Sequence, residues 1–67
     1  MDYNKYEAIR IERGLDDAEV ARRVGFCQTN LSRVKRNPGA TLRADNLLKI
    51  ANLLDCKVSE LLSDKEL

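Results

Sequence analysis

Histidine is absent from this chain of 67 residues, and there are only three glycines. Enzymes use histidine more often than any other side chain as a general base, so its absence removes the commonest acid–base chemistry. The sequence also contains no glycine-rich phosphate loop and no clustered pair of carboxylates. We therefore expect a binding protein that is not an enzyme and has no cofactor.

Cysteine is scarce as well. The two copies, Cys27 and Cys56, lie far apart in the sequence and form no CxxC pair. Zinc sites and redox pairs need ligands at short, regular spacing, so neither is expected. We predict two reduced, partly buried thiols and no metal site.

Long apolar runs are missing too. None approaches the roughly 18 residues that span a membrane, and the N-terminus lacks the apolar stretch of a secretory signal. We expect a soluble, cytoplasmic protein with no membrane partner. The length suits one domain over residues 1–67, with residues 63–67 frayed. Because a chain near this size buries only about 60% of its unfolded surface, every apolar stripe is needed.

The net charge is only +1, but it is unevenly distributed. Residues 1–19 carry −3 and residues 45–67 carry −2, whereas residues 20–44 contain six basic side chains and no acidic one. The six are Arg22, Arg23, Arg33, Lys35, Arg36 and Arg43. Such a block is the electrostatic footprint of a nucleic-acid partner. The alternative is a solvated surface run that binds nothing.

Two short amphipathic helices are predicted within residues 16–36. Asp16 is a good N-cap for the first helix, and Glu19 follows three residues later, which is the spacing of a capping box. Gly25 can take the positive φ that ends this helix. The apolar stripe of the helix consists of Val20, Ala21 and Val24.

The second helix, from about Gln28 to Arg36, places Leu31 and Val34 on its buried side. Its outer face carries amide, hydroxyl and guanidinium groups. They belong to Gln28, Thr29, Asn30, Arg33 and Arg36. Because a helix with such a face can read base edges in the major groove of DNA, we call it the reading helix.

A further helix is expected on the N-terminal side of this pair. Asp2 or Asn4 can cap it, and Gly14 ends it. Tyr3 and Tyr6 have the helical spacing of core residues, which favours packing in the core over stacking on bases.

A turn is expected after the reading helix, at residues 37–40, where Pro38 forbids a continued helix. This loop should lie near the DNA backbone, within reach of phosphates for Arg43. The fourth helix starts at Thr41 or, alternatively, at Arg43.

The fourth helix has a broad apolar surface. Its main stripe consists of Leu47, Ile50, Ala51 and Leu54. Leu48 and Leu53 flank this stripe, so we expect cover on more than one side, from the same chain or from a second subunit. Asp55 can adopt the left-handed conformation that ends the helix. A short fifth helix is expected over residues 58–63.

These segments resemble the Cro/CI-type (XRE-type) helix-turn-helix DNA-binding domains. Within the motif the matching positions are Gly14, Leu15, Glu19, Val20, Ala21, Val24, Gly25, Phe26, Leu31 and Ser32. The match continues through Leu47, Ile50, Ala51, Leu54, Val58, Glu60, Leu61 and Leu62. It therefore covers nearly the whole chain. A match over all the expected helices at their spacings is more specific than the motif alone.

The resemblance implies an all-α, compact, five-helix fold like that of lambda repressor, with a central helix-turn-helix. It implies a phage-like or bacterial regulator that binds double-stranded DNA in a sequence-specific manner and represses transcription by occupying an operator. It also implies a homodimer, at least on DNA, bound to a pseudo-palindromic operator whose half-sites lie about one helical turn (~34 Å) apart. Self-association would use surfaces such as Leu53, Val58 and the last helix.

The resemblance also suggests roles for single residues. The first two positions of the family's reading helix touch base edges, and here they are Gln28 and Thr29. Arg33, one turn further on, would reach a guanine or a phosphate. For Asn30 three roles stay open: a base contact, a phosphate contact or a structural role. The expected phosphate contacts are Arg10, Lys35, Arg36 and Arg43.

Two positions depart from the family pattern. Asp17 stands where relatives often have a glutamine that contacts phosphate, and its charge would repel one. Arg10 and Lys35 occupy positions where relatives often have an Arg–Glu pair, and two cations cannot form it. Arg10 must therefore find another carboxylate or face the DNA, and Lys35 either contacts phosphate or is solvated.

Two other functions remain open. The same fold serves antitoxins, which bind a toxin protein and autoregulate their own promoter. The chain could also be a protein-interaction module that has lost DNA binding, an interpretation for which Asp17 is the best sign.

Overall fold

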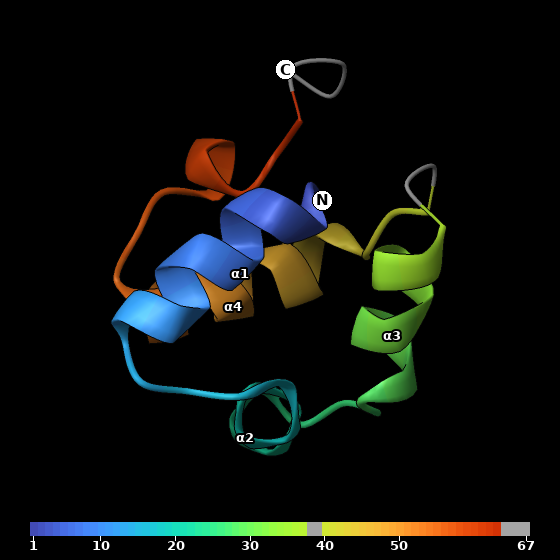
Figure 1. Cartoon of the computed structure of the whole chain (residues 1–67), viewed down its shortest axis with the longest axis horizontal. Coiled ribbons are helices and arrows are strands. Elements are labelled where there is room, and N and C mark those ends of the chain that lie inside the picture. The colour runs from blue at the N-terminus through green and yellow to red at the C-terminus, as the bar shows by residue number, and fades with distance from the viewer. Residues whose placement is uncertain (38–39, 64–67) are drawn as a thin grey trace.

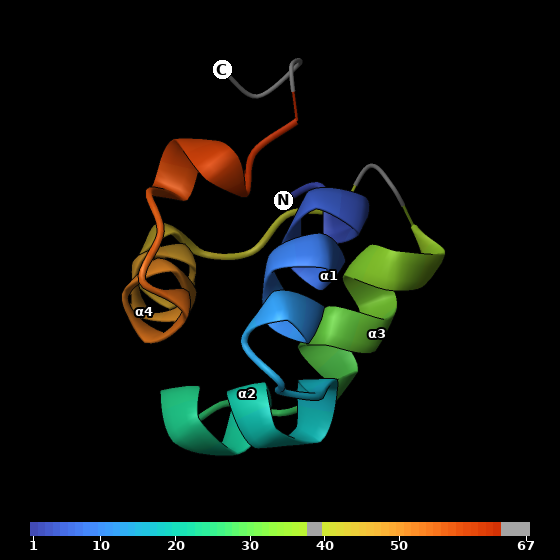
Figure 2. The same ribbon diagram turned by 60° about the vertical axis from the view of Figure 1, so that its left-hand side comes forward.

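Four α-helices and one short 3-10 helix follow one another in the computed structural model, which describes residues 1–37 and 40–63. In chain order they are α1 (Tyr3–Glu12), α2 (Asp17–Val24), α3 (Thr29–Arg36), α4 (Ala44–Leu54) and η1 (Val58–Glu60). Figure 1 shows α1 crossing in front of α4, with α2 below them and α3 at the side. In the rotated view of Figure 2, α1 and α3 lie side by side.

The helix ends follow from local chemistry. The Asp2 carboxylate caps α1 by accepting a hydrogen bond from the Asn4 backbone N–H at 3.0 Å. Of the two predicted caps, Asp2 and Asn4, it is therefore Asp2 that caps the helix. Asp16 Oδ1 accepts from the Glu19 backbone N–H at 2.8 Å, as its N-cap role predicts. Gly25 ends α2 with a φ of 88°, a conformation that favours glycine.

The fourth helix begins later than Thr41. Arg43 is its N-cap and makes no capping bond with its side chain, so the alternative boundary is the observed one. Asp55 ends the helix with a φ of 54°, as expected for its left-handed conformation. The Arg13 Nε–H donates to the Leu54 carbonyl at 2.8 Å and satisfies one of the open carbonyls at this end.

The prediction of five α-helices is wrong at the last one. Among the described residues of this segment, 58–63, there is only the single 3-10 turn of η1, and Leu61 ends it. The Leu61 carbonyl accepts from the Asp2 backbone N–H at 2.8 Å, and the Leu62 carbonyl accepts from Lys5 Nζ at 3.0 Å. In an α-helix the Leu61 N–H would bond to the Lys57 carbonyl four residues back, but it donates to the Val58 carbonyl at 2.9 Å, so the turn is of the 3-10 type.

The core lies between the helices and is entirely apolar apart from one hydroxyl. The described residues with buried side chains are Met1, Tyr6, Val20, Ala21, Leu31, Val34, Ala40, Leu42, Leu47, Ile50, Ala51, Leu54 and Leu61. The stripes predicted for α3 and α4 are all among them. Of the α2 stripe, Val20 and Ala21 are buried, and Val24 is partly buried and packs against the core. Met1, Ala40 and Leu42 are core residues that helical periodicity could not indicate, since they lie outside the helices.

Cover of α4 is incomplete in this chain. Leu53 packs against the core, but Leu48 is 54% exposed. The rest of the chain therefore covers the flank of α4 that carries Leu53 and leaves the flank that carries Leu48 exposed. No helix in the described part of the chain has the length and apolar character needed to cross a membrane.

Candidate DNA interface

The outward side of α3 is the candidate interface. Leu31 and Val34 are buried in the core, and this fixes which side of the helix faces solvent. Gln28, Thr29 and Arg33 are all exposed, as the sequence predicts for a reading helix. Thr29, Arg33 and Arg36 follow one another at helical spacings of four and three residues, so they form one stripe.

The start of α3 leaves its polar groups accessible. Gln28 precedes the helix in a helical conformation (φ −59°, ψ −25°), and its side chain makes no capping hydrogen bond. The free amide can therefore face a ligand. Asn30 is half-buried, so less of its side chain is accessible than that of Gln28.

Arg33 is exposed but already has one partner. Its Nη2 donates to the Thr41 carbonyl at 3.2 Å, which links α3 to the segment before α4. A guanidinium has five N–H donors, so others remain for a base or a phosphate. Pro38 lies outside the described residues, so the predicted turn there is not described.

The positive block does not act as one uniform surface. Arg22 and Arg23 both bond to the Glu19 carboxylate, and these hydrogen bonds hold the pKa of Glu19 below its usual value. That part of the block is paired within α2. Arg36 and Arg43 are exposed, and Arg43 Nε forms an exposed ion pair with Asp45 Oδ1 at 3.5 Å.

Asp17 is the centre of a polar cluster that no local sequence pattern indicates. The Tyr3 hydroxyl donates to Asp17 Oδ2 and the Tyr6 hydroxyl donates to Asp17 Oδ1, each at 2.7 Å. Arg10 Nε lies 3.2 Å from the same Oδ1 as an ion pair without hydrogen-bond alignment. The carboxylate at the start of α2 is thus bound to α1 from three sides.

Arg10 is therefore placed differently from the expected phosphate contact. Its side chain is only 13% exposed. One of its Nη atoms donates to the Leu15 carbonyl at 2.9 Å, and its guanidinium lies 5.7 Å from the centre of the Tyr6 ring. Arg10 has found the other carboxylate that the sequence required, and a phosphate contact would break these bonds. We leave it out of the candidate interface.

The two tyrosine hydroxyls remain donors at ordinary pH. Burial and the hydrogen bond to Asp17 raise the pKa of Tyr3 to about 12. The same two causes raise the pKa of the fully buried Tyr6 further. Tyr3 and Tyr6 are thus part of the α1–α2 junction, as their predicted packing requires, and Tyr6 has no face open for a base.

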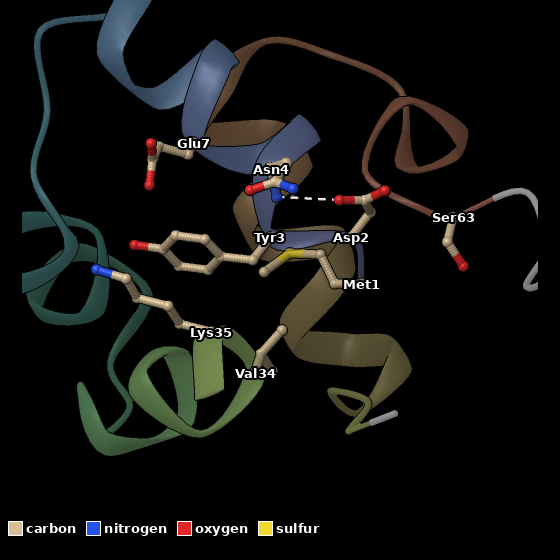
Figure 3. Close-up of a pocket in the computed structure, with 8 residues that line it drawn as sticks. All are labelled: Met1, Asp2, Tyr3, Asn4, Glu7, Val34, Lys35 and Ser63. Carbon is tan, nitrogen blue, oxygen red and sulfur yellow. Dashed lines mark hydrogen bonds between the residues drawn. The ribbon is translucent and has the colours of Figure 1, made fainter. Parts of the chain in front are cut away.

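Lys35, at the other end of α3, lies against α1. Its ammonium is 5.7 Å from the centre of the Tyr3 ring, within the range of a cation–π contact. Figure 3 shows its side chain extending alongside that ring. Lys35 is exposed, but it is partnered by an aromatic face.

The cysteines are free thiols in this structure. Cys27 is exposed just before α3, so its predicted partial burial is wrong, and Cys56 is partly buried as predicted. Burial raises the pKa of the Cys56 thiol. Among residues 1–37 and 40–63, no three of the usual metal-binding side chains come together as a site.

Two helices joined by a glycine turn, the second with its polar side outward, define a helix-turn-helix DNA-binding domain. The chain belongs to the Cro/C1-type helix-turn-helix DNA-binding domain family, whose model matches residues 7–66. It is also similar to the N-terminal DNA-binding domain of SinR, the master biofilm regulator of Bacillus subtilis. The two are 29% identical and superpose with a TM-score of 0.77, over 97% of this chain and 94% of that one. No curated protein sequence matches the chain.

Proposed function

We propose that this chain binds a specific double-stranded DNA site with the outward side of α3 and represses transcription by occupying an operator. One observation carries the proposal. Gln28, Thr29 and Arg33 are exposed together, while Leu31 and Val34 hold the opposite side of α3 in the core. The polar side of α3 is thus available to a major groove without any change in the fold.

The exposed side chains suit particular bases. Gln28 can bond in bidentate fashion to N6 and N7 of adenine, and the Thr29 methyl group can pack on the methyl of thymine. Arg33 can bond to a guanine with the N–H groups that Thr41 does not use. Asn30, which is less exposed, is a secondary candidate.

Phosphate contacts are proposed for Arg36 and Arg43. Both are exposed, and they lie on either side of the segment that leads from α3 to α4. Contacts of this kind set the register of a protein on DNA without selecting a sequence. Lys35 is considered separately below.

Two copies are proposed to bind one operator. The eight residues of α3 extend over about 12 Å, which is the length of three to four base pairs at about 3.4 Å each. A single copy can therefore read only a short half-site. Two copies related by a two-fold axis would read a pseudo-palindrome with half-sites about 34 Å apart.

Selection of bound duplexes from a random pool, followed by titration, tests the proposal. Gln28→Ala should weaken binding to the selected site by about 1 to 3 kcal/mol and leave binding to random DNA unchanged. Asn52→Ala, which removes an exposed amide on α4, is the matched control and should change neither affinity. Equal losses on both kinds of DNA would count against base reading by Gln28.

Repression needs its own measurement. In a purified transcription reaction, the selected site placed over a promoter should make transcript levels fall as the protein is added. A template with the site moved well upstream is the control, and equal transcript from both templates would contradict an operator-occupying repressor.

A further inference from the structure

A continuous series of contacts connects α3 to α2 by way of α1. The Lys35 ammonium of α3 lies over the Tyr3 ring of α1. The Tyr3 hydroxyl donates to Asp17 at the start of α2. The Tyr3 and Tyr6 rings, with their centres 5.3 Å apart and tilted by 59°, lie side by side in this series. The two helices of the motif are thus joined through a third helix as well as through their own turn.

We propose that Asp17 is a positioning residue for DNA recognition, which acts through Tyr3 to hold Lys35, and with it the C-terminal half of α3, against α1. The proposal rests on the proposed function, since it assumes that α3 reads the DNA. It assigns Lys35 to the aromatic face of Tyr3 rather than to a phosphate.

Leu31 and Val34 anchor α3 in the core, but the packing of α3 on α1 is incomplete at its outer edge. A pocket of about 520 Å³ lies between the two helices, with Met1, Tyr3 and Glu7 on the α1 side and Val34 and Lys35 on the α3 side. Figure 3 shows the Lys35 side chain crossing this space beside the Tyr3 ring. Where interlocking side chains do not fill the space between two helices, a directional contact has more influence on their angle.

The charge at Asp17 strengthens this contact. A phenol that donates a hydrogen bond to a carboxylate is polarised, which makes its ring more attractive to a cation. Asp17 is 18% exposed, so solvent screens the carboxylate only in part. Arg10, whose Nε lies 3.2 Å from the Asp17 oxygen that also accepts from Tyr6, balances the carboxylate charge.

The angle of α3 matters because hydrogen bonds to base edges are directional. Rotation of the helix about its own axis would move Gln28, Thr29 and Arg33 together relative to the groove floor. Binding to random DNA depends on charge and tolerates such a movement. Loss of the Lys35 contact should therefore weaken binding to the selected site and leave random DNA largely unaffected.

Lys35→Met tests the assignment, because methionine keeps the apolar stem and removes the ammonium. We expect about a two- to fivefold loss of affinity for the selected site, the range expected for an exposed cation–π contact. The salt dependence and the affinity for random DNA should stay unchanged. If both affinities fall and the salt slope drops by about one, Lys35 contacts a phosphate and the proposal is overturned. Lys49→Met on α4, also an exposed lysine, is the control.

A double-mutant cycle tests whether Asp17 acts through Lys35. Asp17→Asn keeps the shape of the side chain and removes its charge. It should lower the preference for the selected site in the original protein, and it should have little further effect when Lys35→Met is already present. If the two losses simply multiply, Asp17 does not act through Lys35. Circular dichroism and urea titration confirm that each variant is folded.

Amide hydrogen exchange in the free protein separates this proposal from the proposed function. Asp17→Asn should speed exchange in the last turn of α3 as well as at the α1–α2 junction. Unchanged exchange in α3 would refute the positioning role even if the domain binds DNA. Faster exchange in α3 would support the connection even if no DNA sequence were selected by the wild-type chain.

Discussion

Replacing Tyr6 by phenylalanine should destabilise the fold far more than the loss of one oxygen atom suggests. The Tyr6 side chain is fully buried, and its hydroxyl donates to Asp17 Oδ1 at 2.7 Å. A hydrogen bond to a charged group contributes about 1.5 to 3 kcal/mol. The ring itself remains in Tyr6→Phe, so the change isolates the hydroxyl. We expect a loss of about 2 kcal/mol.

That loss is large for a chain of 67 residues. At 0.05 to 0.15 kcal/mol per residue, the whole free energy of unfolding is about 3 to 10 kcal/mol. In urea, a small domain loses about 1 to 2 kcal/mol of stability per molar denaturant. The unfolding midpoint of Tyr6→Phe, followed by circular dichroism, should therefore fall by about 1 to 2 M.

Tyr3→Phe is the matched control, because it removes the second hydroxyl on the same carboxylate from a more exposed site. Its loss should be smaller, at about 1 kcal/mol. If the midpoint of Tyr6→Phe equals that of the original protein, the Asp17 cluster does not hold α1 on α2, and our reasoning about this junction fails.

Two other predictions concern alkaline pH and salt. The pKa of Tyr3 is raised to about 12 in the folded chain from an ordinary value of 10, so folding favours the neutral phenol. This contribution to stability is complete below pH 10 and is lost as the pH rises to about 12. The urea midpoint should therefore fall between pH 10 and 12, and it should fall less steeply in Tyr3→Phe. Tyrosinate absorbance that appears near pH 10 in the folded protein would contradict this prediction. Arg36→Gln and Arg43→Gln should each lower the slope of log affinity against log salt by about one. Arg22→Gln should change that slope less, because two nitrogens of Arg22 bond to Glu19, whereas Arg43 has a single ion pair with Asp45 at 3.5 Å and no hydrogen bond to it. Equal changes in all three variants would refute the assignment.

The helix boundaries could be predicted where the signal lies within a few residues of the boundary itself. The Asp16 carboxylate needs only the N–H of Glu19, three positions away. The left-handed ends at Gly25 and Asp55 likewise depend on what those residues can do with their own φ. The exposed side of α3 followed from the burial of Leu31 and Val34 for the same local reason.

Features that depend on distant partners could not be predicted in the same way. Asp17 was interpreted as a charge that would repel phosphate, because nothing near it in the sequence shows that it meets Tyr3 and Tyr6. Its position now has a structural explanation, so it no longer supports a domain that has lost DNA binding. The expected fifth helix was wrong as well: the segment forms one 3-10 turn, and the Leu61 carbonyl that follows it accepts from Asp2 near the opposite end of the chain, a contact that no local pattern indicates.

The hydrogen bonds between the start of α1 and the segment after η1 also have a practical consequence. Met1 and Ser63 line the same pocket, so both ends of the described chain lie on one side of the molecule. In both views α2 lies on the far side of the ribbon from the N-terminus (Figures 1 and 2). A fluorophore or a fused reporter attached at residue 1 would therefore lie far from α2 but beside Val34 and Lys35 of α3, and would report on that half of the helix.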